Sequence, residues 1–144
     1  MTEELEKFRL ELVKRGIQYT DASTPEIQGM RIDRIHFFYQ DRHYSVIHGI
    51  GTYGGLNKYT RKDNGLLEVY GGKYDDPVGF LTADDVVKLI FDQDKQAYFN
   101  YGNEKLCFKC SNQDNNSNGM YCMVMSPKVV FVNGKCNCFI EDKK

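Results

Sequence analysis

The five cysteines are the residues of this chain whose type most directly suggests a chemical site. Four thiolates are enough to hold a structural zinc ion, and the candidate ligands are Cys107, Cys110, Cys136 and Cys138. Their spacing is not that of a zinc ribbon or finger, because Cys107 and Cys110 would point to opposite faces of a strand and no glycine follows Cys110 to form a metal-binding knuckle. We therefore favour thiols packed in the core and expect no cofactor, with zinc as the alternative.

A glycine-rich stretch provides a second candidate site, since Gly49-x-Gly51-x-x-Gly54 matches the pattern that cradles a nucleotide phosphate after a strand. That pattern requires a following helix whose amino-terminal N–H groups face the phosphate. The segment that follows, 56–65, is polar and has no helical periodicity. We expect the glycines to bend a connection between two strands rather than to bind a small anion.

A basic tip with interleaved tyrosines follows the glycines and is the third candidate site. Such a patch could bind phosphates or stack on single-stranded bases, or it could contact another protein, since Tyr and Arg tend to carry binding energy at interfaces. A solvated loop is the simplest alternative, and we rank protein contact above nucleic acid. The candidate partner-binding residues are Tyr53, Lys58, Tyr59, Arg61 and Lys62.

The remaining titratable residues carry no catalytic signature. Adjacent aspartates before Pro77 are typical of a turn, and no local signature of a Cys–His nucleophile surrounds any cysteine. We expect no catalytic residues, and an uncharacterised enzyme is the third functional alternative. The titratable residues whose type could serve catalysis are His36, His43, His48, Glu68 and the pair Asp75-Asp76.

Composition and charge narrow the class of protein. The 144 residues, 41% of them hydrophobic, fit a single domain, 1–144, with its own core. The chain has 19 basic and 20 acidic residues, so no long-range field attracts nucleic acid or anionic lipid. No apolar run approaches the roughly 18 residues of a membrane span, and the amino terminus lacks a signal-peptide pattern. We expect a cytoplasmic protein with reduced cysteines and no membrane partner.

The first helix is predicted over residues 2–15. Leu5, Phe8 and Leu12 recur at helical spacing on one face. Gly16 can adopt the left-handed conformation that ends a helix, and Ile17 then packs against Leu12 in a Schellman motif. We expect this helix to pack its apolar stripe on a sheet.

Strands are predicted over 30–39 and 44–47, with a polar link at 40–43 that makes them an antiparallel hairpin. A further strand is predicted at 66–70, after the glycine-rich excursion. The apolar residues of 30–39 do not all share one face of the strand. This pattern predicts either a bulge near Asp33 and Arg34 or a strand that is buried on both faces. The polar segment 20–29 is predicted to be a connecting loop.

The second helix, predicted over 82–92, has the clearest local signals. Thr82 and Asp85 form a capping box, and Leu81 can staple onto Val86. A short strand around Val78 and Phe80 leads into it. The helix is more apolar than a surface helix needs, so we expect it to be buried on more than one side.

The carboxy-terminal part, 96–144, is predicted to contain the cysteines in β-hairpins. The Asn-Gly pair at 133–134 predicts a two-residue turn that sets Phe131 opposite Cys136. The asparagine-rich tract 111–119 is predicted to be an exposed mobile loop. The predicted fold class is therefore α+β, with an antiparallel β-sheet and two helices packed on it. Residues 1–92 form this helix–sheet–helix core, and β-hairpins follow at the carboxy terminus.

The segments YSVIHGIGTYGG, GLLEV and GFLTADDVV, with the first helix, resemble small uncharacterised accessory proteins of bacterial phages and prophages over residues 1–92. The resemblance implies a protein that binds and blocks a host protein, such as a nuclease of a CRISPR or other defence system. We therefore expect a non-catalytic, phage-encoded inhibitor of a host factor, whose loops 52–64 and 111–119 meet the partner. A nucleic-acid-binding module that uses the tip 58–62 is the alternative.

Overall fold

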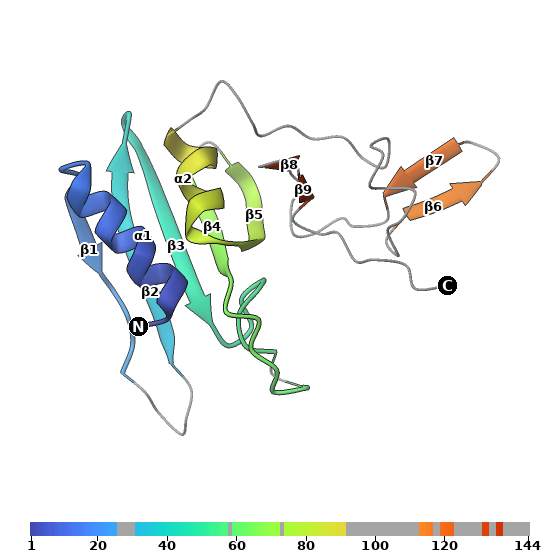
Figure 1. The fold of residues 1–144 in the computed structure, drawn as a ribbon, viewed down its shortest axis with the longest axis horizontal. Helices are drawn as coiled ribbons and strands as arrows, with labels where there is room; N and C mark the ends of the chain where they lie inside the picture. Colours follow the sequence, from blue (N-terminus) through green and yellow to red (C-terminus); the bar gives the residue numbers. More distant parts are fainter. Residues whose placement is uncertain are drawn as a thin grey trace.

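A computed structural model of the chain describes residues 1–25, 31–57, 59–72, 74–91, 113–116, 119–122, 131–132 and 135–136. Two helices, α1 (Glu3–Lys14) and α2 (Ala83–Phe91), lie on one face of a five-stranded antiparallel sheet, so the predicted α+β class is confirmed (Figure 1). The strands neighbour one another in chain order: β1 (Tyr19–Asp21), β2 (Ile32–Tyr39), β3 (Arg42–Gly49), β4 (Leu67–Gly71) and β5 (Tyr74–Leu81).

The core lies between the helices and the sheet. In β2 and β3, alternate residues are buried on the face that the helices cover, as period-2 patterning predicts. Phe8 of α1 packs against Phe37, with 5.6 Å between their ring centroids, and Phe37 packs against Tyr44 at 5.5 Å. The fully buried side chains of this core include Leu5, Leu12, Ile35, Val46, Leu67, Val69, Leu81, Leu89 and Ile90.

The predicted bulge in β2 is wrong, because β2 pairs with β3 without interruption from Ile32 to Tyr39. Asp33 takes the inward position and is only 5% exposed. Its carboxylate accepts a hydrogen bond from the Thr2 N–H at 3.1 Å and another from Arg31 Nε at 2.5 Å, which offset the cost of burying it. The register irregularities lie instead between β4 and β5.

The β2–β3 hairpin is tighter than predicted. The structure has a two-residue turn at Gln40 and Asp41, both with left-handed φ angles of 51° and 62°, where the sequence predicted a four-residue polar link. Such a turn matches the right-handed twist of the flanking strands. Part of the predicted loop 20–29 is also strand, since Thr20 and Asp21 pair with His36 and Ile35.

The ends of both helices confirm the sequence signals. The Ile17 N–H donates to the Leu12 carbonyl at 3.0 Å, with Gly16 at φ 70°, as a Schellman motif requires. In α2, the Asp85 N–H donates to Thr82 Oγ1 at 3.2 Å and the Thr82 N–H donates to the Asp85 carboxylate at 3.0 Å. This reciprocal pair is the predicted capping box.

One contact between the helices has no local signal in the sequence. The carboxylate of Glu4 in α1 accepts a hydrogen bond from the Ala83 N–H at 2.7 Å, so it caps the positive end of α2. The contact joins residues that are 79 positions apart and fixes α1 against α2. Both helices are thereby held on the same face of the sheet.

Two short antiparallel pairs are described in the carboxy-terminal part. Strand β6 (Gln113–Asn116) pairs with β7 (Gly119–Cys122), so the prediction of a loop over 111–119 is wrong for 113–116 and for Gly119. Strand β8 (Phe131–Val132) pairs with β9 (Lys135–Cys136), with Phe131 opposite Cys136. The turn residues 133–134 lie outside the described residues.

Candidate functional site

The excursion, residues 50–66, joins β3 to β4 and folds back on its own backbone at the end of the sheet (Figure 1). The Leu56 N–H donates to the Gly49 carbonyl at 3.0 Å, and the Gly51 N–H donates to the Leu56 carbonyl at 3.0 Å. Thr52 Oγ1 accepts from the Gly49 N–H at 3.0 Å and donates to the Gly49 carbonyl at 2.8 Å. The strands on either side pair antiparallel, which confirms the prediction of a glycine bend between two strands.

Five backbone N–H groups of the glycine segment, residues 49–56, are already used within the protein. Those of Gly49, Gly51, Thr52, Gly55 and Leu56 donate to acceptors inside this segment. A phosphate cradle needs such groups to point at the ligand, preferably at a helix amino terminus. Instead, Leu56 takes part in isolated bridges with Ile50 and Asp63, so this conformation does not support anion binding.

A buried carboxylate also faces the glycine segment from the sheet. Glu68 of β4 is 8% exposed, and its Oε1 accepts a hydrogen bond from the Tyr53 N–H at 3.1 Å. Burial raises the pKa of Glu68 above its ordinary value, although the hydrogen bond from Tyr53 and the charge of Arg34 act in the opposite direction. A negative charge at this position would repel a phosphate group.

A second side chain of the sheet holds the other end of the excursion. His48 of β3 is 7% exposed, and its Nε2 lies 2.8 Å from Asp63 Oδ1, which also accepts from the Gly65 N–H at 2.8 Å. Burial acts to raise the pKa of Asp63, but the hydrogen bonds from Gly65 and His48 dominate together and lower it. His48 therefore has a positioning role.

The tip of the excursion, residues 57–62, is closed by Asn57. Its N–H donates to the Lys62 carbonyl at 2.9 Å, and its carbonyl accepts from the Arg61 N–H at 2.8 Å. Its side-chain oxygen accepts from the N–H groups of Tyr59 and Thr60 at 2.9 and 3.1 Å. Tyr59 is 83% exposed on this hydrogen-bonded turn.

The five predicted partner-binding residues have different surroundings. Tyr59, Arg61 and Lys62 are exposed at the tip, and Arg61 has a left-handed φ of 61°. Tyr53 is half-buried, with its ring centroid 6.4 Å from that of Phe80. Lys58 lies outside the described residues.

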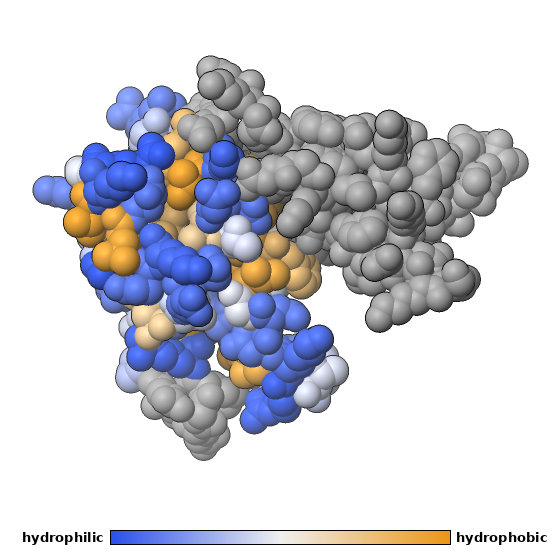
Figure 2. All heavy atoms as spheres, viewed as in Figure 1, coloured by the Kyte–Doolittle hydropathy of each residue, from blue (hydrophilic) through white to orange (hydrophobic). Residues whose placement is uncertain are grey.

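A shallow hollow of about 280 Å³ lies beside the tip. Tyr53, Tyr59 and Phe80 contribute to its wall, together with other residues of 51–57 and Asn64. Figure 2 shows one face of the molecule, on which the excursion is mainly hydrophilic with paler, intermediate areas. The hollow and the tip form one surface with aromatic, amide and basic groups.

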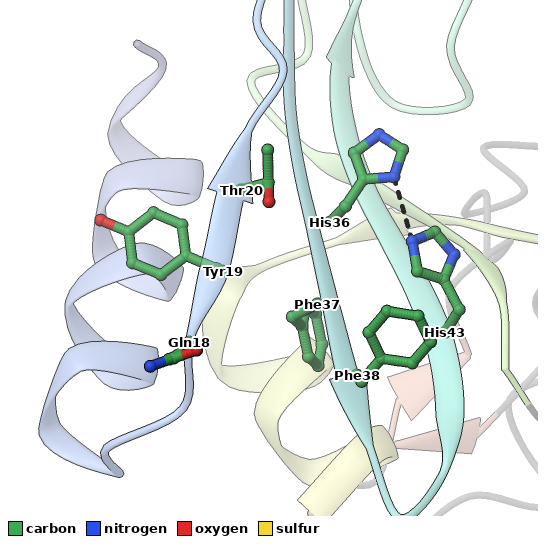
Figure 3. A pocket seen from close by; sticks show the side chains of 7 residues that line it. All are labelled: Gln18, Tyr19, Thr20, His36, Phe37, Phe38 and His43. Atoms are coloured by element: carbon green, nitrogen blue, oxygen red, sulfur yellow. Dashed lines mark hydrogen bonds between the residues drawn. The ribbon is translucent and has the colours of Figure 1, made fainter.

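The face of the sheet opposite the helices carries a second cluster, which the sequence did not predict. His36 of β2 and His43 of β3 point toward each other, with 3.3 Å between His36 Nδ1 and His43 Nε2 (Figure 3). Phe38 packs on His43 with 4.9 Å between ring centroids and is 68% exposed. Burial, followed by the charges of His43 and Arg34, lowers the pKa of His36.

Other sequence candidates do not form a described site. Asp75 and Asp76 lie within strand β5, so their assignment to a turn is wrong. Cys107, Cys110 and Cys138 lie outside the described residues, and Cys136 is described only by its backbone, in β9. Among the described residues, no group of three or more His, Cys, Asp or Glu side chains could hold a metal ion. No helix in the same part of the chain is long and apolar enough to cross a membrane.

No protein-family model, curated protein or solved structure matches this chain.

Proposed function

We propose that this protein is a non-catalytic binding protein and that its excursion, through the tip 57–62 and the adjoining hollow, contacts another protein. The observation that carries the proposal is the combination of a backbone fixed by Asn57 with a Tyr59 side chain that is 83% exposed. A pre-ordered loop loses little conformational entropy on binding. Tyr and Arg are also the residue types that most often carry interface energy.

The surroundings of the tip favour a protein partner over a polyanion. Asp63 and Glu68 place carboxylates on and beneath the excursion, and the chain has a net charge of −1. Binding to a nucleic-acid backbone depends on neutralising several phosphates at once, which two described basic side chains, Arg61 and Lys62, support weakly. Nucleic-acid binding is therefore the alternative outcome of the test below.

The resemblance of residues 1–92 to phage accessory proteins supports a host protein as the partner. We propose on that ground that binding inhibits a host factor, with a defence nuclease as the class of partner that the resemblance implies. A blocking protein needs a stable contact surface and no catalytic group. The hydrogen bonds that Asn57 makes to the backbone of 59–62 are compatible with that requirement.

A pull-down from a bacterial host lysate with matched variants tests the proposal. We expect one stoichiometric protein partner to be retained by the wild-type chain and lost with Tyr59→Ala combined with Arg61→Ala. Loss of each hot-spot side chain should weaken binding by roughly 30-fold, about 2 kcal/mol, so the double variant should bind on the order of 1,000-fold more weakly if the two losses add. Tyr70→Ala is the control, because Tyr70 is also an exposed tyrosine, at 54%, but lies on the sheet.

Three outcomes contradict the proposal. Equal capture by the double variant and the wild type would place the interface elsewhere. Salt-dependent retention on DNA or RNA, lost in the double variant, would favour the nucleic-acid alternative. Failure of any protein to bind in stoichiometric amount from several host lysates would count against an inhibitor.

A further inference from the structure

The histidine pair lies on the sheet face opposite the helices, here called the open face because no described helix covers it, and it stands on a continuous hairpin. His36 and His43 lie on neighbouring strands near the two-residue turn at Gln40 and Asp41, in a hairpin whose register is continuous. Their rings face each other with 5.1 Å between centroids (Figure 3). The hairpin backbone therefore holds both imidazoles near one point in space.

The separation of the two nitrogens is compatible both with a hydrogen bond and with a shared metal ion. His36 Nδ1 and His43 Nε2 are 3.3 Å apart, at the long end of hydrogen-bond distances (Figure 3). Two imidazole ligands on a tetrahedral zinc ion, each at about 2.0–2.1 Å, lie about 3.3 Å apart. Ligands at right angles, as in square-planar or octahedral coordination, would lie only about 2.9 Å apart.

The surroundings leave the pair accessible. A hollow of about 260 Å³, lined in part by Thr20 and Phe38, adjoins both rings. His43 is exposed and His36 is half-buried, so a hydrated ion can reach them. Arg34 acts in two directions, because its positive charge opposes a cation but also favours the neutral, metal-binding form of His36.

We propose that His36 Nδ1 and His43 Nε2 bind one divalent transition-metal ion with tetrahedral preference, of the Zn²⁺ class, on the open face of the sheet. Imidazole nitrogen is a favoured ligand of such ions. Two ligands leave two coordination positions for water or for a donor group of another molecule. The proposed ligands include no residue of the excursion and no cysteine.

An imidazole-detected NMR titration of the full chain with ZnSO₄ at pH 7, under reducing conditions, tests this site. The chain has three histidines, and we expect the ring signals of His36 and His43 to move together and saturate at one equivalent. The ring of His48, held by Asp63 at 2.8 Å, should not move and serves as the internal control. Zinc bound by cysteines alone would leave the signals of His36 and His43 unchanged.

A single substitution separates chelation from binding by one imidazole. In His36→Gln, the His43 signal should require on the order of 100-fold more zinc to move, since a second linked ligand typically adds at least that factor in affinity. An unchanged midpoint for His43 in this variant would overturn the proposal. So would the absence of any shift of His36 and His43 in the wild-type chain at saturating zinc.

Discussion

At the scale of single residues, Glu68 is a buried acid that positions the excursion and has no catalytic role in the proposed function. Its carboxylate is 8% exposed and accepts from the Tyr53 N–H at 3.1 Å. The sequence made Glu68 a catalytic candidate by its type alone. In the structure, Glu68 accepts a hydrogen bond from a backbone N–H, and no basic side chain among the described residues lies within hydrogen-bond distance of it. Its role is therefore to hold the excursion against β4.

This role predicts a pH dependence of stability. Because the pKa of Glu68 is raised in the folded protein, the folded state holds its proton more tightly, and stability falls as the pH rises from 4.5 through the folded pKa. Glu68→Gln keeps an oxygen acceptor for Tyr53 and removes the buried charge. We expect this variant to gain stability relative to the wild type at pH 8 but not at pH 4, as measured by urea unfolding at both values.

Glu68→Ala is the matched comparison, because it removes the acceptor as well as the charge. The Tyr53 N–H then lacks its partner, which should cost about 1 kcal/mol relative to Glu68→Gln at either pH. If Glu68→Gln and the wild type respond to pH in the same way, the carboxylate does not titrate as its burial requires.

At the scale of elements, the order of the excursion depends on a position where no side chain fits. A Cβ atom at Gly55 would lie 2.2 Å from both the Gly49 carbonyl oxygen and Thr52 Oγ1. These atoms belong to the hydrogen bonds that close the glycine segment. We expect Gly55→Ala to lower the free energy of unfolding by about 3 kcal/mol, the upper range for overpacking, in urea denaturation.

Gly65→Ala is the control for this substitution. A Cβ atom at Gly65 meets nothing within 4 Å, but the residue has a left-handed φ of 66°. Its cost should therefore be the backbone strain alone, about 1 kcal/mol. A smaller effect at Gly55 than at Gly65 would mean that the glycine segment is open in solution.

The elements also show what the sequence could and could not predict. The ends of both helices follow from local signals, because Gly16 and the Thr82–Asp85 pair act within a few residues. The turn at Gln40–Asp41 has only a weak signal, because Asp41 tolerates a left-handed φ but Gln40 is not one of the Asn, Asp or Gly residues that such turns favour, and the pairing of β2 with β3 imposes it. Strand β1 was missed because only its pairing with β2 makes it a strand.

The candidate sites follow the same division. The excursion was predicted because its glycines and basic tip are contiguous in the sequence. The histidine pair was not predicted, because the four-residue link expected at 40–43 placed His43 outside the strand. Recognising the two-residue turn would have set Phe38 opposite His43 and placed His36 on the same face.

At the scale of the whole molecule, the described sheet and core close within the first part of the chain. Each strand of the five-stranded sheet pairs with its neighbour in sequence, so most pairings are between residues close in the chain. The described core cluster extends from Leu5 to Ile90, and Glu4 links α1 to α2 through the Ala83 N–H. Local pairings of this kind favour fast folding, and a core whose described members all lie between Leu5 and Ile90 favours folding of this part without the rest.

We therefore expect a fragment of residues 1–95 to fold by itself. It should unfold cooperatively in urea with a free energy of unfolding of about 5 kcal/mol, the lower range for a small domain. A fragment of residues 1–81 is the control, since it lacks α2 and with it the buried Val86, Leu89 and Ile90, and it should not unfold cooperatively. If 1–95 also unfolds without a cooperative transition, residues beyond 95 complete the core, and the chain folds only as one unit of 144 residues.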